Sequence, residues 1–420
     1  MRARQSTRPL IALLAVALAL AGCDSLFGPG SPADPDPVEP IDRLPRDLTA
    51  AELEAISASN AFGFDLLAEV WGEAPGENAF FSPFSASMAL GMTMNGADGA
   101  TFDAMRRTLR FEAMSEEEIN ASYRGLLDLL VALDPAVEVA IGNAVWHRAH
   151  LVLRPEFRER VEASFDAMVR GLDFDDPASA DTINRWVSEA TAGRIEAMVD
   201  PPIPAQVVAY LMNAVYFKAG WTVPFDSDLT YSGPFRRADG STTDADFMLR
   251  DDTLRYHATE EWAAVDLAYG GGAWSMTVVV PRGEHTVGDL VASLDAEGWD
   301  ALVDGFETTR VMLSLPRFEL EWEGVLNDPL IELGMGPAFA PGADFTRMFE
   351  GIGPWISEVR QKSFVRVDEE GTEAAAVTSV VMVTSMPPEL RADRPFLFAI
   401  RERLSGTILF MGVITDPPPA

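Results

Sequence analysis

The sequence predicts an α+β fold, with helices in the first half of the chain and strands in the second half. Helical periodicity is found before about residue 193, and runs rich in β-branched residues begin at residue 207. The two kinds of segment do not alternate, which argues against a doubly wound parallel sheet. Of the 420 residues, 48% are hydrophobic, so the chain can bury a large core. No repeat or linker divides residues 49–420.

The helices are predicted from apolar residues that share one face. Such residues recur in three sets, namely Leu53, Ile56, Phe64, Leu67 and Trp71; Ile119, Tyr123, Leu126 and Leu130; and Ile183, Trp186, Val187 and Ala190. Ser115 and Glu118 form a capping box before the second set, and Gly193 ends the third. Residues 82–96, "SPFSASMALGMTMNG", are typical of a buried helix that is apolar nearly all round.

Strands are predicted over residues 207–217, 274–281 and 310–320, which are β-rich and bounded by turns or proline. Residues 395–414, "PFLFAIRERLSGTILFMGVI", predict two further strands joined by a turn that contains Gly406.

The N-terminus is typical of an exported protein. Arg2, Arg4 and Arg8 precede an apolar stretch over residues 11–20, as in a secretory signal peptide. The segment "LAGC" resembles the lipobox of bacterial lipoproteins, which is cut before its cysteine. We therefore expect residues 1–22 to be removed and Cys23 to carry the lipid that anchors the protein to the cell envelope, at the periplasmic face or the cell surface. An ordinary signal peptide is the alternative. Cys23 is the one cysteine, which excludes a disulfide within the chain.

Composition sets further expectations. Residues 23–48 are rich in Pro, Gly and Asp, so they are expected to form a disordered tether, and the domain is expected to span residues 49–420. The net charge is −33. Such an acidic surface repels nucleic acid and heparin-like polyanions, so neither is expected as a partner.

Catalytic chemistry is not predicted. The chain has no G-x-S-x-G elbow, S-x-x-K motif, P-loop or dinucleotide fingerprint. His147 and His150 could share a helix face and bind a metal, although two histidines among polar neighbours are more often surface residues. We expect no enzyme activity, no metal and no cofactor.

The segment "VDEEGTEAAAVTSVVMVTSMPP", residues 367–388, is unusual for a surface loop because small and apolar residues dominate it. By itself the part "GTEAAAVT" is also compatible with a short Ala-rich helix or a flexible loop. Its length without proline exceeds that of most strands.

This segment resembles the reactive-loop hinge of the serpins, a family of suicide inhibitors of proteases. Other segments resemble the family in the same order, namely residues 78–101, 211–225, 313–320, 333–345 and 394–417. The resemblance implies a serpin fold, in which helices pack around a large mixed main sheet, further sheets are present, and a reactive-centre loop at about residues 369–390 is exposed. It also implies a metastable monomer that is cleaved in this loop, inserts the loop as a new strand, and traps the acyl-enzyme of a serine protease.

The resemblance assigns roles to particular residues. The hinge comprises Glu369, Glu370, Gly371, Thr372, Glu373, Ala374, Ala375, Ala376, Val377 and Thr378. Counting from Gly371, strand alternation turns the small residues Thr372, Ala374, Ala376 and Thr378 inward. Ser82, Ser85 and Asn213 match the family's shutter, Gln361 stands where most members have a histidine, and Trp221 matches the tryptophan of the breach. A glutamine can still donate and accept hydrogen bonds.

The position of the scissile bond suggests the target. Counting forward from the hinge gives Ser385–Met386, and counting backward from "PPELRADRPF" gives Thr384–Ser385. Both bonds follow a small residue, so elastase-like or subtilisin-like proteases are expected rather than trypsin-like ones. Three further expectations stay open: a non-inhibitory serpin-fold binding protein whose loop is only a substrate, a metal-dependent enzyme that uses His147 and His150, and loop–sheet polymers formed on warming.

Overall fold

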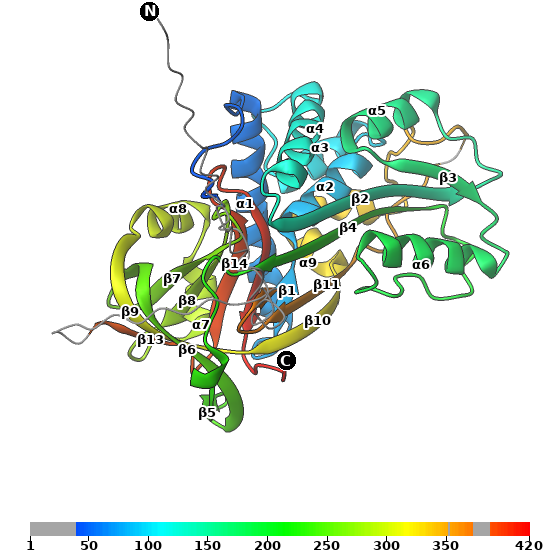
Figure 1. Ribbon diagram of the computed structural model, residues 1–420. Helices are drawn as coiled ribbons and strands as arrows, with labels where there is room; N and C mark the ends of the chain where they lie inside the picture. Colours follow the sequence, from blue (N-terminus) through cyan, green and yellow to red (C-terminus); the bar gives the residue numbers. More distant parts are fainter. Residues whose placement is uncertain (1–38, 352, 373–386) are drawn as a thin grey trace, which may run out of the picture. The chain divides into compact units, whose positions relative to one another are not determined.

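The computed structural model describes residues 39–351, 353–372 and 387–420 (Figure 1). Cys23 and the predicted signal peptide lie outside the described residues. No helix in the described ranges is both long enough and apolar enough to cross a membrane.

The helices begin where the sequence supplies capping residues. Thr49 with Glu52, Ser115 with Glu118, and Thr286 with Asp289 form capping boxes at three of them. The helices are α1 (Ala50–Glu73), α2 (Pro83–Met94), α3 (Gly99–Thr108), α4 (Glu116–Ala132), α5 (Pro155–Phe165), α6 (Ala178–Ala190), α7 (Val287–Ser293), α8 (Ala296–Asp304) and the short α9 (Asn327–Leu330) and α10 (Gly336–Phe339). The predicted helical segments are confirmed, but Leu53 is 53% exposed, so it lies off the buried face of α1.

The largest sheet has nine strands in the order β1-β15-β14-β8-β7-β6-β9-β13, with β5 paired to β6. Its strands are β1 (Ala79–Phe81), β15 (Ile408–Ile414), β14 (Phe396–Glu402), β8 (Trp274–Pro281), β7 (Trp262–Tyr269), β6 (Thr242–Ala258), β9 (Glu307–Pro316), β13 (Glu389–Arg391) and β5 (Tyr231–Arg236). The predicted C-terminal hairpin is β14 and β15, which are paired antiparallel. The sheet is mixed, because β13 runs parallel to β9.

The strand predicted over residues 310–320 is wrong as a single strand. Pro316 ends β9, because proline cannot donate a ladder hydrogen bond. Arg317 donates its backbone N–H to Asp246, and β10 (Phe318–Val325) then continues in a different sheet.

Two smaller sheets accompany the nine-stranded sheet within the described residues. One has the order β12-β4-β2-β3, formed by β12 (Gly371–Thr372), β4 (Ala209–Gly220), β2 (Val137–Arg148) and β3 (Met168–Leu172). The other pairs β10 with β11 (Arg360–Val367). In Figure 1 the long strands β2 and β4 run together, and β10 and β11 form a separate pair. Within the described residues, no ladder joins β4 to β11.

The apolar side chains form a large core and a smaller cluster. Odd-numbered residues of β4 such as Phe217 and Ala219 belong to the large core, which includes α2. Met212 of β4 belongs to the smaller cluster, together with Ile183 of α6 and Val207. Strand β4 therefore has a core face toward α2 and a second face toward α6.

The N-terminal segment, residues 39–48, differs from the prediction of a disordered tether that reaches residue 48. Ile41 donates its backbone N–H to Gly271 O at 2.7 Å, and Arg46 pairs with Glu52 at 2.6 Å. Ile41, Leu44 and Leu48 pack against the large core. The described domain therefore begins ten residues before residue 49, because these three apolar side chains, in a segment that also contains prolines, are partly buried against the core.

Candidate functional site

The hinge begins at a tight reversal after β11. Asp368 and Gly371 form an antiparallel bridge, so β12 runs antiparallel to β11. β12 also pairs antiparallel with β4, with Gly371 opposite Gly220 and Thr372 opposite Ala219. A strand that continued β12 would thus run antiparallel to both β4 and β11.

Gly371 is required by this geometry. Its φ is +127°, a conformation that residues with a Cβ rarely adopt. A Cβ there would lie 2.6 Å from Ala219 O and from the Trp221 backbone nitrogen. The hinge glycine therefore allows β12 to approach β4.

The residues before Gly371 are anchored. Trp221 donates its backbone N–H to Glu370 O at 3.0 Å and its indole N–H to Asp368 O at 2.9 Å. Phe225 donates its backbone N–H to Glu369 O at 2.9 Å, and the Glu369 carboxylate accepts from Thr230 Oγ1 at 2.5 Å. The start of the predicted hinge is therefore fixed beside the end of β4.

Trp221 holds the other side of this junction. It is buried and stacks on Tyr269 at 4.3 Å between ring centroids, with 11° between the ring planes. Trp221, which the sequence matches to the tryptophan of the breach, thus contacts the start of the hinge through its indole and its backbone.

The remaining predicted loop residues lie outside the described residues. These are Glu373, Ala374, Ala375, Ala376, Val377 and Thr378 of the hinge, and Thr384, Ser385 and Met386 at the reactive bond. The side chain of Thr372 is also outside the description.

The first turn of α2 binds β11 through Gln361. Ser82 caps α2, and its backbone N–H donates to Gln361 Oε1 at 3.1 Å. Gln361 Nε2 donates to Ser82 O at 3.0 Å, so the buried amide of Gln361 both donates and accepts. Ser82 Oγ donates to Leu409 O of β15 at 2.6 Å.

The same turn binds β4 through Asn213. Ser85 Oγ donates to Asn213 Oδ1 in a short contact. Asn213 Nδ2 donates to Asn143 Oδ1 at 2.8 Å, and Asn143 Nδ2 donates to Phe165 O at 2.7 Å. Ser82 and Ser85 therefore hold β11 and β4 separately, and the helix bridges the two strands.

Asn143 was missed from the sequence. It lies on β2 directly opposite Asn213 of β4. Its signal was a polar amide in the middle of the apolar run "VAIGNAVW", which is uncommon in a buried strand. The register that places the two amides together became known only from the structure.

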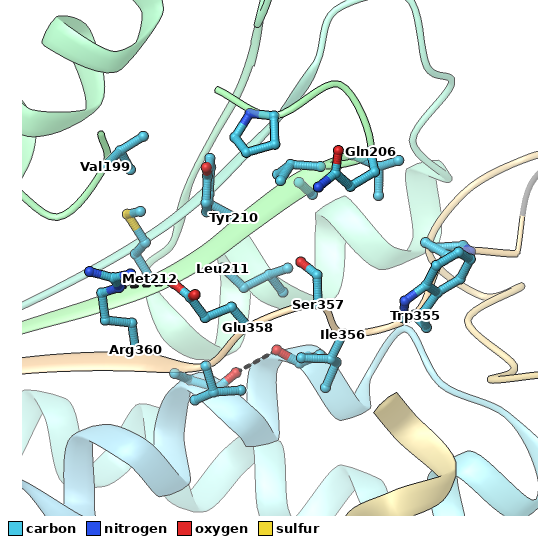
Figure 2. Close-up of a pocket in the computed structure, with 18 of the residues that line it drawn as sticks. Val199, Gln206, Tyr210, Leu211, Met212, Trp355, Ile356, Ser357, Glu358 and Arg360 are labelled. Carbon is cyan, nitrogen blue, oxygen red and sulfur yellow. Dashed lines mark hydrogen bonds and ion pairs between the residues drawn. The ribbon is translucent and has the colours of Figure 1, made fainter. Parts of the chain in front are cut away.

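A cavity of about 860 Å³ lies between β4 and β11. Figure 2 shows Tyr210, Leu211 and Met212 of β4 on one side, and Ser357, Glu358 and Arg360 on the other. Ser85 and Asn213 line it, as does Gln361. Trp355, which is 47% exposed, lines it as well (Figure 2). Within the described residues no ladder joins the two strands that bound the cavity, which is the arrangement required to accept another strand between them.

The two histidines do not form a metal site. They do not share a helix face, because His147 lies in strand β2 and His150 in the turn after it. His147 is buried rather than at the surface, and burial lowers its pKa. The described residues contain no cluster of three or more side chains suited to a metal ion.

Comparisons with known proteins agree with this geometry. A family model described as "Serpin (serine protease inhibitor)" matches residues 57–417. Iripin-1 from Ixodes ricinus is 32% identical over 368 residues, which are 86% of this chain and 94% of the relative. Leukocyte elastase inhibitor from Sus scrofa is 31% identical over 381 residues, which are 87% of this chain and 100% of the relative. The structure of human thyroxine-binding globulin is similar with a TM-score of 0.81 and 26% identity, over 88% of this chain and 100% of that chain.

Proposed function

The chain belongs to the serpin family, and on that premise we propose that it inhibits serine endopeptidases as a suicide substrate. In this proposal a protease cleaves the reactive loop and becomes an acyl-enzyme. The loop then inserts between β4 and β11, and the attached protease is carried along and distorted before it can deacylate.

The observation that carries the proposal is the pairing of β12 with one end of β4, at Ala219 and Gly220, while a cavity lies between β11 and the other end of β4, at residues 209–213. The first residues of the hinge already occupy the strand position that the rest of the loop would extend. The buried helix turn beneath the cavity holds β4 and β11 separately, so a new strand need not break hydrogen bonds between them.

Extending the register of β12 supports the predicted insertion. Because Gly371 lies opposite Gly220, Thr378 would lie opposite Asn213. Opposite side chains of an antiparallel pair lie on the same face, and Asn213 faces α2 through Ser85. Thr372, Ala374, Ala376 and Thr378 would then face α2 and the large core, as the sequence predicts.

The outward face fits the same register. Glu373 would lie opposite Lys218, a pair of opposite charge that favours the ladder. The fourteen residues 372–385 would span roughly 46 Å at ~3.3 Å per residue, enough to cross a large sheet.

We propose an elastase-like or subtilisin-like target. The residue before the scissile bond is Thr384 or Ser385, and a small side chain fits a small or medium apolar pocket. A trypsin-like pocket needs Lys or Arg at this position. The name of the porcine relative, leukocyte elastase inhibitor, supports the same class.

We propose further that the mature protein is exported and held at the cell envelope by a lipid on Cys23. The supporting observations are the apolar stretch over residues 11–20 and the segment "LAGC". Mass spectrometry of the mature N-terminus tests this, because an unmodified N-terminus at another residue contradicts it.

A second candidate is a serpin-fold binding protein whose loop is only a substrate. The cavity of about 860 Å³ and the similarity to human thyroxine-binding globulin favour it. Such a protein needs no insertion, so cleavage would not be followed by trapping.

The test is to mix residues 39–420 with pancreatic elastase, subtilisin, chymotrypsin and trypsin, and to separate the products on denaturing gels. A covalent band at the summed mass with one of the first three enzymes supports inhibition, and mass spectrometry of the released peptide identifies the scissile bond. Cleaved protein with full protease activity favours the second candidate. Cleavage beside Arg391 contradicts the proposed target class.

A further inference from the structure

The segment between β4 and β5, residues 221–230, carries two exposed apolar side chains close to the start of the hinge. Val223 is 42% exposed and Leu229 is 50% exposed. Leu229 ends a single turn of 3₁₀ helix, η1 (Ser227–Leu229), in which no residue is buried. Both side chains therefore present apolar area to solvent, which a partner can cover.

Buried contacts fix the backbone of this segment. Phe225 is 2% exposed and packs against Trp221, with 6.0 Å between the ring centroids. Arg250 of β6 donates from Nη1 to Val223 O at 2.6 Å, and its guanidinium lies 5.8 Å from the centre of the Phe225 ring. Val223 and Leu229 thus lie on an anchored backbone, so a partner that contacts them has little backbone entropy to remove.

Three carboxylates lie in the same region. Asp226 accepts from the Asp228 backbone N–H at 3.0 Å and so begins η1, and the Asp228 side chain is exposed. Glu370 is also exposed, and its carbonyl accepts from the Trp221 backbone N–H at 3.0 Å, which places it beside the segment. Within the described residues, none of these three carboxylates forms an ion pair.

The arginines that contact this region are paired with other acids. Arg250 Nη2 lies 2.8 Å from Asp252 Oδ2. Arg317 Nη2 lies 2.8 Å from Asp246 Oδ2, and its Nη1 lies 3.6 Å from Glu369 Oε2. The three carboxylates without an ion pair therefore add negative potential to the surface, and such a potential attracts a cationic partner.

Both ends of the reactive loop lie next to this region. The chain enters the loop just after Glu370, and it returns at Pro388, whose carbonyl accepts from the Met312 backbone N–H at 2.9 Å. Met312 of β9 lies opposite Asp251 of β6, and Asp251 follows Arg250, the arginine that binds the segment. Because the chain joins these two points, a protease that attacks it between them lies next to the segment.

We propose that Val223, Asp226, Asp228, Leu229 and Glu370 form a docking surface for the attacking protease, and that this surface favours proteases with basic side chains beside the active-site cleft. The inference rests on the proposed function and adds a contact outside the reactive loop. The apolar side chains supply contact area, and the carboxylates raise the rate of encounter. The surface thus distinguishes proteases that accept the same small residue before the scissile bond.

The test measures the second-order rate constant of covalent complex formation by residues 39–420. Two probes are used, an elastase with a net positive charge and a subtilisin with a net negative charge. Asp228→Lys is compared with Glu159→Lys on α5, which changes the net charge equally at another exposed position. Leu229→Ala is compared with Leu53→Ala on α1, because Leu53 is 53% exposed and Leu229 is 50% exposed.

We expect Asp228→Lys to slow complex formation with the cationic elastase about fivefold at about 0.1 M ionic strength, where the Debye length is about 10 Å. The difference should largely disappear at about 1 M, where that length is about 3 Å. The anionic subtilisin should react faster with Asp228→Lys, and Glu159→Lys should leave both rate constants nearly unchanged. Leu229→Ala should slow both proteases about fivefold at either ionic strength, since an apolar contact is not screened. Leu53→Ala should react like the wild type.

Equal rate constants for each surface variant and its control would overturn the inference. A wild-type dimer that Leu229→Ala dissociates in sedimentation would also overturn it, because the surface would then bind a second copy of the chain. If Leu229→Ala does not fold, Val223→Ala takes its place, with the same expected result.

Failure of the proposed function gives a different result. If the wild-type loop is cleaved without trapping, inhibition is refuted, and the rate constants of loop cleavage, with the same expected ratios, decide the inference about the docking surface. A loop that neither protease cleaves would overturn both.

Discussion

At the scale of single residues, Gly371 decides whether the hinge can pair with β4. Gly371→Ala would place a Cβ 2.6 Å from backbone atoms of Ala219 and Trp221, so β12 must detach. We expect the free energy of unfolding in urea to fall by about 1–3 kcal/mol, the usual cost of such backbone strain.

Gly240→Ala is the matched control. Gly240 has a φ of +83°, but nothing lies within 4 Å of the position that a Cβ would take there. The free energy of unfolding of Gly240→Ala should fall only by the cost of placing a residue with a Cβ in the left-handed conformation, about 1 kcal/mol. Equal losses for the two variants would show that the contact with β4 contributes nothing.

Gln361 connects β11 to α2. Gln361→Ala removes both hydrogen bonds to the Ser82 backbone and leaves buried polar groups without partners. We expect a loss of about 1–3 kcal/mol in the free energy of unfolding. Gln206→Ala, at an exposed position that lines the same cavity, should be nearly neutral. Similar values for both variants would contradict a stabilising role for Gln361.

His147 should make the fold sensitive to mild acid. Burial lowers its pKa, and nearby Arg158 lowers it further. The folded protein thus binds this proton less readily than the unfolded chain, whose histidine pKa is about 6.5. Stability linked to His147 is therefore complete above the unfolded pKa, and it is lost as the pH falls from that value through the lower folded pKa.

The measurement is urea unfolding at about pH 7.5 and pH 5.5, one unit on each side of the unfolded histidine pKa. The wild-type protein should lose more stability on acidification than His147→Gln. His285→Gln, at an exposed position, should behave like the wild type. An equal acid response in all three proteins would contradict the assignment.

At the scale of elements, the N-terminal segment supports the turn next to the hinge. Ile41 binds Gly271, Asp134 also accepts from Gly271, and the neighbouring Gly270 donates to Gly220 O beside the hinge pairing. Residues 39–48 thus belong to the surroundings of β12.

A protein that starts at residue 49 should therefore melt at a lower temperature than one that starts at residue 39. The expected decrease is about 2–4 °C for each kcal/mol of lost packing and hydrogen bonding. Differential scanning calorimetry of the two proteins provides the measurement. Identical melting temperatures would show that the segment only rests on the domain.

At the scale of the whole molecule, the sheet that contains β12 and β4 stays separate from β10 and β11. The exposed strand position is a site where another chain's loop could pair. We expect a ladder of polymers on native gels after incubation a few degrees below the melting temperature.

A synthetic peptide of residues 372–385 should suppress this ladder, because it would occupy the same strand position. A scrambled peptide of the same composition is the control. A single monomer band up to the unfolding transition would contradict the prediction, and equal suppression by both peptides would contradict its mechanism.

Whether a feature could be predicted from the sequence depended on how far apart along the chain its interacting residues lie. The buried helix α2 and the capping box at Ser115 depend on residues a few positions apart. The division of residues 310–320 at Pro316 also had a local signal, the proline, although the change of sheet did not. The pairing of Asn143 with Asn213 depends on strand register, which side chains seventy positions apart do not reveal.

By itself, the sequence determined the α+β class, the family resemblance and the small, proline-free hinge, because periodicity, capping and composition act over neighbouring residues. Only the tertiary structure decided that β4 and β11 are held apart on one helix turn, that residues 39–48 belong to the domain, and that residues 221–230 lie beside the start of the hinge. These features join parts of the chain that are distant in sequence. Their contacts contribute to the free energy of folding only when those distant parts pack together.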